Sequence, residues 1–153
     1  MFKISDSIFD RYWKLGYAEL TQPERMFLCI WGLEGEVNNG GFDQYYFNTA
    51  GDHALDAVKS LQAIGANHTA ELVKAVNGLF GSGGPPSVRE ERQEQLRALR
   101  DPVAEKMAEA DQEFSKDRDN LEELLTAFVS QNLAAFRPKP PMNNPPAPPE
   151  CGQ

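Results

Sequence analysis

Reactive side chains are few in this sequence, and their spacing builds no familiar catalytic or metal-binding motif. The two histidines are His53 and His68. His53 and Asp56 would share a helix face, but two ligands without a third do not define a metal site. The chain also lacks the H-E-x-x-H, C-x-x-C and phosphate-loop motifs. We therefore predict no bound metal and no cofactor.

The sequence gives little support for a catalytic nucleophile. Ser60, His53 and Asp52 can be drawn as a triad, but no nucleophile-elbow sequence surrounds the serine. Cys29 lies in an apolar run, which predicts a buried thiol of low reactivity. The other cysteine, Cys151, lies in a proline-rich tail, so we expect two free thiols in a reducing compartment. The sequence predicts a protein that is not an enzyme.

Carboxylates are the abundant chemical groups, and they give the chain a formal net charge of -8. Residues 1–80 and residues 81–137 each carry a net charge of -4, and residues 138–153 carry none. The negative charge therefore belongs to the folded part of the chain. Such a surface repels the phosphates of a nucleic acid and attracts a basic protein. We predict a basic protein as partner and no direct contact with nucleic acid.

Two stretches could present carboxylates on one exposed helix face. The first has helical spacing and consists of Asp101, Glu105, Glu109 and Glu113. The second surrounds the start of the last predicted helix and consists of Asp119, Glu122 and Glu123. We treat these seven side chains as candidates for binding a protein. The alternative is that they are solvated faces opposite an apolar seam.

Apolar residues recur at helical spacing along most of the chain. We expect Thr21 and Asp52 to cap helices, and a capping box at Ser87–Glu90 to open a charged one. Asp101 begins a further helix, unless it continues the charged helix across a kink. The expected helices lie near 5–18, 21–37, 42–49, 52–65 and 67–80, then from Ser87, from Asp101, and from Asp119 or Asn120 to 136.

These elements predict an all-α protein, a compact bundle of about seven or eight helices. We expect one domain over residues 1–137, and an extended tail over residues 138–153, where 7 of 16 residues are proline. No apolar run approaches the ~18 residues that a membrane span needs, and the charged N-terminus is unlike a signal peptide. We therefore expect a cytoplasmic protein without membrane contact. Its wide apolar helix faces allow a homodimer.

The segment from Glu34 to Asn48 combines a turn with polar and aromatic side chains. Asn and Gly accept left-handed backbone readily, so Asn38–Gly41 should end one helix and start another. In a structural interpretation, Phe42, Tyr46 and Phe47 fill the core, and Asn38 and Asn39 satisfy backbone groups at the corner. In a functional interpretation, the same corner is a ligand pocket. The residues concerned are Asn38, Asn39, Gly40, Gly41, Phe42, Gln44, Tyr46 and Asn48.

The run E-V-N-N-G-G-F-D-Q-Y-Y-F-N at residues 36–48 resembles the signature of a bacterial family of helical domains named after a DNA-mimic protein. The resemblance extends over roughly residues 20–136, and its specific part is residues 36–51. It implies an all-α fold. It also implies an acidic surface that takes the place of the DNA phosphates on a basic protein, such as a transcription factor.

Three functions remain open at this point. The first is a DNA mimic that occupies the DNA-binding face of a basic protein. The second is an immunity-type protein that neutralises a basic toxin, for which the charge would look the same. The third is a helical domain that binds a small molecule at the Asn38–Asn48 corner.

Overall fold

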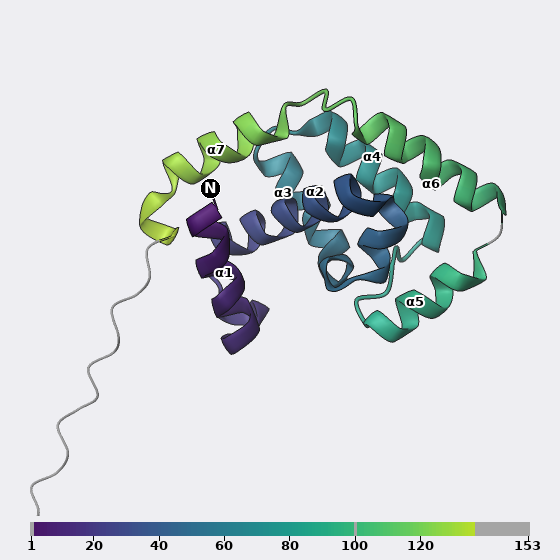
Figure 1. The fold of residues 1–153 in the computed structure, drawn as a ribbon, viewed down its shortest axis with the longest axis horizontal. Coiled ribbons are helices and arrows are strands. Elements are labelled where there is room, and N and C mark those ends of the chain that lie inside the picture. The colour runs from purple at the N-terminus through teal and green to yellow at the C-terminus, as the bar shows by residue number, and fades with distance from the viewer. Residues whose placement is uncertain (1, 100, 137–153) are drawn as a thin grey trace, which may run out of the picture.

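The computed structural model describes residues 2–99 and 101–136, and this part of the chain contains seven α-helices and no strand (Figure 1). The prediction of an all-α bundle is confirmed, whereas the predicted proline-rich tail lies outside the described residues. Within these residues, no helix is long and apolar enough to span a membrane. The helices are α1 (Phe2–Leu15), α2 (Gln22–Phe47), α3 (Ala54–Ala63), α4 (Asn67–Asn77), α5 (Arg89–Ala98), α6 (Asp101–Phe114) and α7 (Leu121–Gln131).

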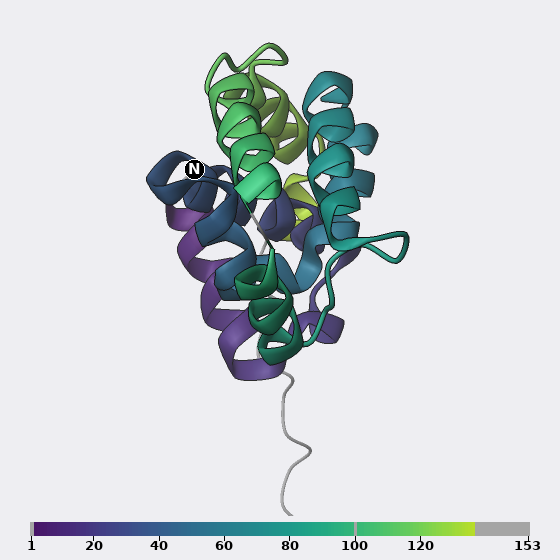
Figure 2. The same ribbon diagram turned by 90° about the vertical axis from the view of Figure 1, so that its right-hand side faces the viewer.

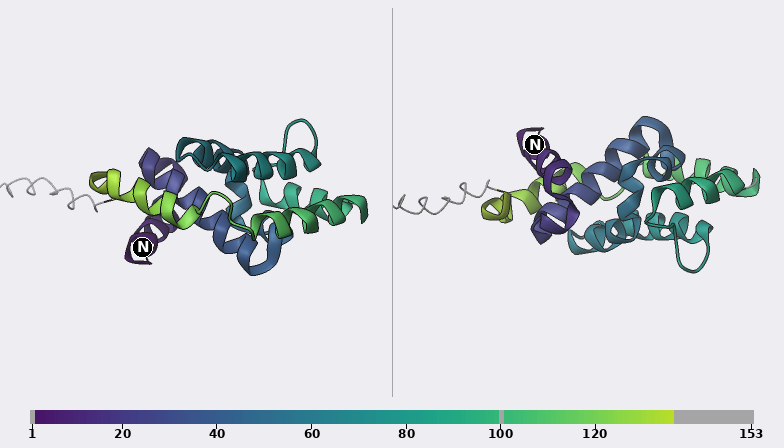
Figure 3. Two further views of the ribbon diagram at one scale, coloured as in Figure 1. Left: turned by 90° about the horizontal axis from the view of Figure 1, so that it is seen from above. Right: turned by 90° about the horizontal axis from the view of Figure 1, so that it is seen from below.

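Helix α2 crosses the middle of the molecule, and α1, α3, α5, α6 and α7 all pack against it (Figures 1 and 3). Its central side chains Phe27, Ile30 and Leu33 are fully buried, as the apolar run in the sequence predicts. The predicted cap at Thr21 is confirmed as a capping box, in which Thr21 and Glu24 satisfy each other's backbone N–H groups. The buried Glu24 also pairs with Arg11, which joins α1 to α2.

Several of the surrounding helices also contact one another. Helices α3 and α4 pack against each other, and α4 lies beside α6 (Figure 2). Helices α6 and α7 follow one another end to end along one edge of the molecule (Figures 1 and 3). This edge contains both predicted carboxylate stretches.

A sharp corner divides α2 where the sequence predicts a break. Gly40 and Gly41 have non-helical backbone angles, and the φ of Gly41 is 77°. The N–H of Phe42, the first residue after the corner, donates to Oδ1 of Asp111 on α6 at 2.7 Å. The short aromatic helix predicted after the corner is therefore present, and a carboxylate from a distant helix holds its first turn.

Three helix boundaries differ from the sequence predictions. The prediction that Asp52 caps α3 is wrong, because Asp52 lies in the 3₁₀ turn Thr49–His53 and pairs with Arg92. The predicted capping box at Ser87–Glu90 is wrong, because Val88 takes the cap position and makes no side-chain bond there. The kinked-helix alternative is also wrong: Leu99 is extended (φ -65°, ψ 132°), so α5 and α6 are separate helices.

Candidate functional site

The aromatic corner is held in place by one fully buried arginine. The Arg92 side chain is 0% exposed, and its guanidinium donates to Oδ1 of Asp52 at 2.6 Å. It also donates to four backbone carbonyls, those of Tyr46 (2.6 Å), Pro86 (2.8 Å), Asn48 (2.9 Å) and Ser87 (3.3 Å). A β-carbon on Gly51 would lie 2.8 Å from Nε of Arg92, so glycine is required for this approach. Arg92 thus cross-links α5 to the segment that follows α2.

Three polar side chains of the corner segment, Gln44, Tyr46 and Asn48, make hydrogen bonds within the protein. Gln44 and Asn48 both donate to the same Glu36 oxygen, Oε2, at 2.7 and 2.8 Å. The Tyr46 hydroxyl donates to Asn77 on α4 at 2.7 Å, and the Asn77 amide donates to the carbonyl of Ala54. These contacts support the structural interpretation for most of the signature.

Two details of that interpretation are wrong. Asn38 and Asn39 are exposed, and their side chains make no hydrogen bond to any described residue, since Asp111 provides the acceptor at the corner. Phe47 is 41% exposed, and Tyr45, fully buried beside Phe42 and Tyr46, fills the core in its place. Helical spacing accounts for the difference, because Tyr45 lies three residues after Phe42 on the same helix face, whereas Phe47 lies five residues after it.

The outer edge formed by α6, α7 and the turn between them concentrates the negative charge of the molecule. Residues 101–131 contain nine carboxylates and three basic side chains, a net charge of -6 within a total of -8. We call this surface the acidic edge. The negative charge is therefore less evenly spread than the equal net charges of residues 1–80 and 81–137 indicate. Five of the seven predicted candidates are exposed on the acidic edge: Asp101, Glu105, Glu109, Glu122 and Glu123.

The other two candidates lie at the junction of α6 and α7, where they anchor the edge to α4. Glu113 pairs with Lys116 and Arg118, each at 2.5 Å, and with His68 at 3.1 Å. Hydrogen bonds from Lys116 and Arg118 hold the pKa of the Glu113 carboxyl at about 2. The cations around Glu113 offset its charge, so Glu113 contributes little to the field outside the molecule.

Of the two caps predicted for α7, Asn120 is confirmed, and Asp119 caps α4 instead. Its carboxylate accepts from the N–H groups of His68 and Thr69, at 3.4 and 2.6 Å, and from the Thr69 hydroxyl at 2.8 Å. Burial alone would raise the Asp119 pKa, but the bonds from Thr69 and His68 outweigh burial and lower it. Asp119 is thus a structural residue within the acidic edge.

Replacing Asp119 by alanine should lower the free energy of unfolding by about 1–2 kcal/mol at neutral pH, the usual value of a helix cap. Because the folded-state pKa is depressed, this stabilisation is present above the unfolded value of about 4 and is lost as the pH falls below it. Urea unfolding of wild type and D119A between pH 7 and pH 3 measures the difference. The control D101A, at an exposed site, should change stability little; a D119A effect that is constant with pH would contradict this assignment.

Carboxylates from α2, which the sequence patterns do not single out, adjoin the acidic edge. Burial raises the pKa of Glu34, and the nearby carboxylates of Asp117 and Glu122 raise it further. The pKa of Asp111 is raised by burial and by Asp43, against the opposing effect of the Phe42 N–H bond. These like-charge interactions indicate that Glu34 and Asp43 of α2 lie near carboxylates of the acidic edge.

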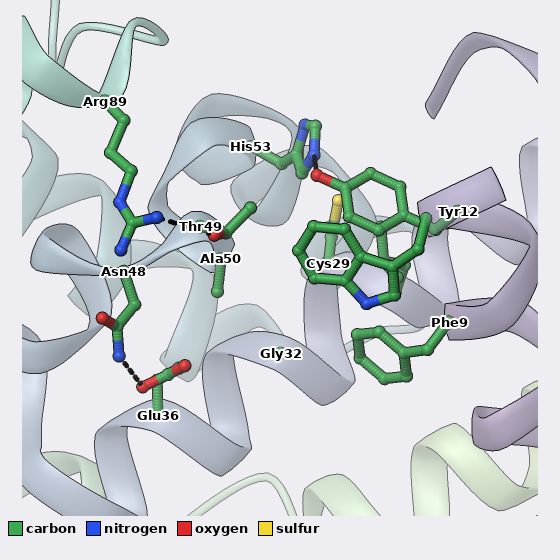
Figure 4. A pocket seen from close by; sticks show the side chains of 12 residues that line it. Phe9, Tyr12, Cys29, Gly32, Glu36, Asn48, Thr49, Ala50, His53 and Arg89 are labelled. Atoms are coloured by element: carbon green, nitrogen blue, oxygen red, sulfur yellow. Dashed lines mark hydrogen bonds between the residues drawn. The ribbon is translucent and has the colours of Figure 1, made fainter. Parts of the chain in front are cut away.

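A cavity of about 220 Å³ lies on another side of α2, between α1 and the 3₁₀ turn Thr49–His53 (Figure 4). Aromatic side chains of α1 form one wall, and Glu36, Asn48 and Arg89 form part of the other. Of the signature residues, Asn48 lines this cavity, whereas Asn38 and Asn39 do not. The cavity therefore adjoins the corner segment through Glu36 and Asn48.

These features define an all-α protein with an acidic outer edge and a central helix bent at a double glycine. A family model for DMP19-like proteins matches residues 18–132, which is most of the chain. The chain therefore belongs to the DMP19-like protein family, in agreement with the resemblance found at residues 36–48. No curated protein and no solved structure matches the chain.

Proposed function

We propose that this protein is a non-enzymatic acidic binding protein of the DNA-mimic type, which occupies the DNA-binding face of a basic protein. The observation that carries the proposal is the acidic edge, where residues 101–131 hold a net charge of -6 along two consecutive helices. Membership of the DMP19-like family supports the same function. Complementary fields of this kind accelerate encounter and select basic partners.

The dimensions of the acidic edge suit a short stretch of DNA backbone. Helices of 14 and 11 residues are about 21 and 16 Å long at ~1.5 Å per residue. One DNA strand places roughly eleven phosphates along the same length, at ~3.4 Å each. Six carboxylates of the acidic edge are exposed and form no ion pair with a described residue: Asp101, Glu105, Glu109, Asp117, Glu122 and Glu123. We expect the acidic edge to imitate part of one DNA strand. We also expect moderate salt to dissociate the complex between this edge and its basic partner.

The basic residues do not interrupt this surface as strongly as their number indicates. Arg92 is buried and paired with Asp52, so it contributes no positive surface charge. Within residues 101–131, all of which the structure describes, Lys116 and Arg118 are paired with Glu113. Lys106 is the one remaining basic side chain of that stretch.

The test compares two triple variants that remove the same charge from different helices. E105Q/E109Q/E122Q neutralises the acidic edge, and E90Q/E91Q/E94Q neutralises three carboxylates of α5. At ~0.5–1 kcal/mol per pair, the first should weaken binding of a captured basic partner by about tenfold or more, and the second by less than about threefold. Binding is measured by calorimetry at low and high salt.

A DNA mimic must also compete with DNA. Duplex DNA should displace this protein from a partner captured at low salt, and the partner should itself bind DNA. A captured basic toxin that duplex DNA does not displace would favour the immunity-type alternative. Equal losses in the two triple variants would contradict the placement of the interface on α6 and α7.

A further inference from the structure

The cavity beside α1 is not used by the acidic edge, and its lining combines an aromatic wall with two opposite charges. Phe9, Tyr12 and Trp13 form the wall on the α1 side (Figure 4). Leu28, Cys29 and Gly32 of α2 and Ala50 close the apolar part. Its volume is about 220 Å³. This size suits a ligand smaller than the drug-sized molecules that fill pockets of about 300–1,000 Å³.

The first charged group of the lining is Glu36, which the surrounding amides hold in a fixed orientation. Both Gln44 and Asn48 donate to its Oε2 atom, at 2.7 and 2.8 Å. No hydrogen bond or ion pair from a described residue reaches Oε1, and Figure 4 shows this oxygen directed away from Asn48. Glu36 therefore presents one unshared carboxylate oxygen, which is an acceptor for an ammonium group.

The second charged group is Arg89, which reaches the cavity from α5. Its Nε donates to the Phe47 carbonyl at 3.2 Å and its Nη1 to the Thr49 hydroxyl at 3.3 Å. These bonds fix the guanidinium but leave Nη2 without a partner among the described residues. A guanidinium held in this way is suited to bind a carboxylate.

The remaining titratable groups of the lining are neutral near pH 7. Burial lowers the pKa of His53, which stacks on Tyr17 at a centroid distance of 3.9 Å and shares a hydrogen bond with Tyr12. Burial raises the pKa of the Cys29 thiol to about 11 and that of the Tyr12 hydroxyl above its usual value. The lining therefore offers one negative and one positive group and no net charge.

We propose that this cavity binds a free α-amino acid with an apolar or aromatic side chain. Glu36 accepts from the ammonium group, Arg89 donates to the carboxylate, and the side chain packs against Phe9, Tyr12 and Trp13. A simple amine would offer no anionic group to Arg89, and a carboxylic acid would offer no cationic group to Glu36. An uncharged apolar ligand would bury both charges unpaired, which is unfavourable. The proposal does not depend on the acidic edge.

Calorimetry with the full chain and three matched probes tests the ligand class. The probes are L-phenylalanine, phenethylamine, which lacks the carboxylate, and 3-phenylpropanoate, which lacks the ammonium group. We expect L-phenylalanine to bind at least tenfold more tightly than either analogue. Binding of an analogue as tightly as L-phenylalanine, or no binding of L-phenylalanine, L-leucine or L-tryptophan at millimolar concentration, would overturn the proposal.

Four variants locate the site. E36Q and R89Q should each weaken L-phenylalanine binding at least tenfold, R89K should retain part of the affinity, and A50F should abolish it by filling the cavity. E94Q and R97Q, on exposed parts of α5, are the matched controls and should bind normally. Because E36Q also alters the bonds of Gln44 and Asn48, thermal unfolding confirms that each variant is folded before it is titrated. Unchanged affinity in both A50F and R89Q would also overturn the proposal.

Discussion

Replacing Arg92 by methionine should lower the free energy of unfolding by about 3–5 kcal/mol, the usual cost of removing one partner from a buried ion pair. Methionine has a similar volume and no charge, so the effect reports the lost bonds rather than an empty space. Asp52 would lose its cation, and the carbonyls of Tyr46, Asn48 and Pro86 would each lose the hydrogen bond from Arg92. Chemical unfolding followed by circular dichroism measures the loss.

The matched control is R97M on the same helix. Arg97 is exposed, and its guanidinium lies 6.0 Å from the centre of the Phe47 ring, so its removal should cost no more than about 1 kcal/mol. R92K keeps the charge but replaces a planar fork by a single ammonium group, so we expect it to recover only part of the stability. An R92M variant as stable as R97M would show that the buried cross-link is not a major source of stability.

The sequence predicted those features of the fold that depend on neighbouring residues. Thr21 caps α2 through Glu24, which is three residues away, and Asn120 caps α7 through the N–H of Glu123. The central position of α2 follows from an apolar run that no solvent-facing helix would tolerate. Each of these contacts lies within one turn of a helix, so that local sequence patterns are sufficient to predict it.

The sequence did not reveal contacts between residues far apart in the chain. Arg92 stands in a helix rich in Glu and Arg, a composition typical of a solvated face, yet it is fully buried. Its partners lie between 5 and 46 residues away, and most of them are backbone carbonyls, which carry no sequence signal. Asp111 and Asp119 behave alike, since each accepts from the backbone of another helix. A carboxylate in such a position has the same sequence pattern as a solvated one.

The two candidate sites differ in the same way, since one depends on a local pattern and the other on residues far apart in the chain. The acidic edge could be predicted, because exposed carboxylates opposite an apolar seam follow helical periodicity. The aromatic cavity could not, because its lining comes from α1, α2, the turn Thr49–His53 and α5. Trp13, which is 67% exposed, is a weak signal, because a large aromatic side chain outside the core often has a role in binding. The cavity could be recognised only once the structure had placed Glu36 and Arg89 near Trp13.

The double-glycine corner supports the second large prediction. Gly41→Ala should lower the free energy of unfolding by about 2–4 kcal/mol, because two costs add. Its backbone angles, φ 77° and ψ -177°, are almost restricted to glycine and cost other residues about 1–3 kcal/mol. A β-carbon there would also clash with Oδ2 of Asp111, so Asp111 must move and weaken its bond to the Phe42 N–H.

Gly35→Ala in the same helix is the matched control, and it should have the opposite sign. Gly35 lies in the regular part of α2, and a β-carbon there would meet no atom of another element within 4 Å. Alanine there should stabilise the protein by about 0.5–1 kcal/mol through the lower entropy of the unfolded chain and better helix propensity. Urea unfolding of both variants separates the two roles. If G41A were as stable as G35A, the corner would not require a glycine, and the signature would need an explanation other than the attachment of α2 to α6.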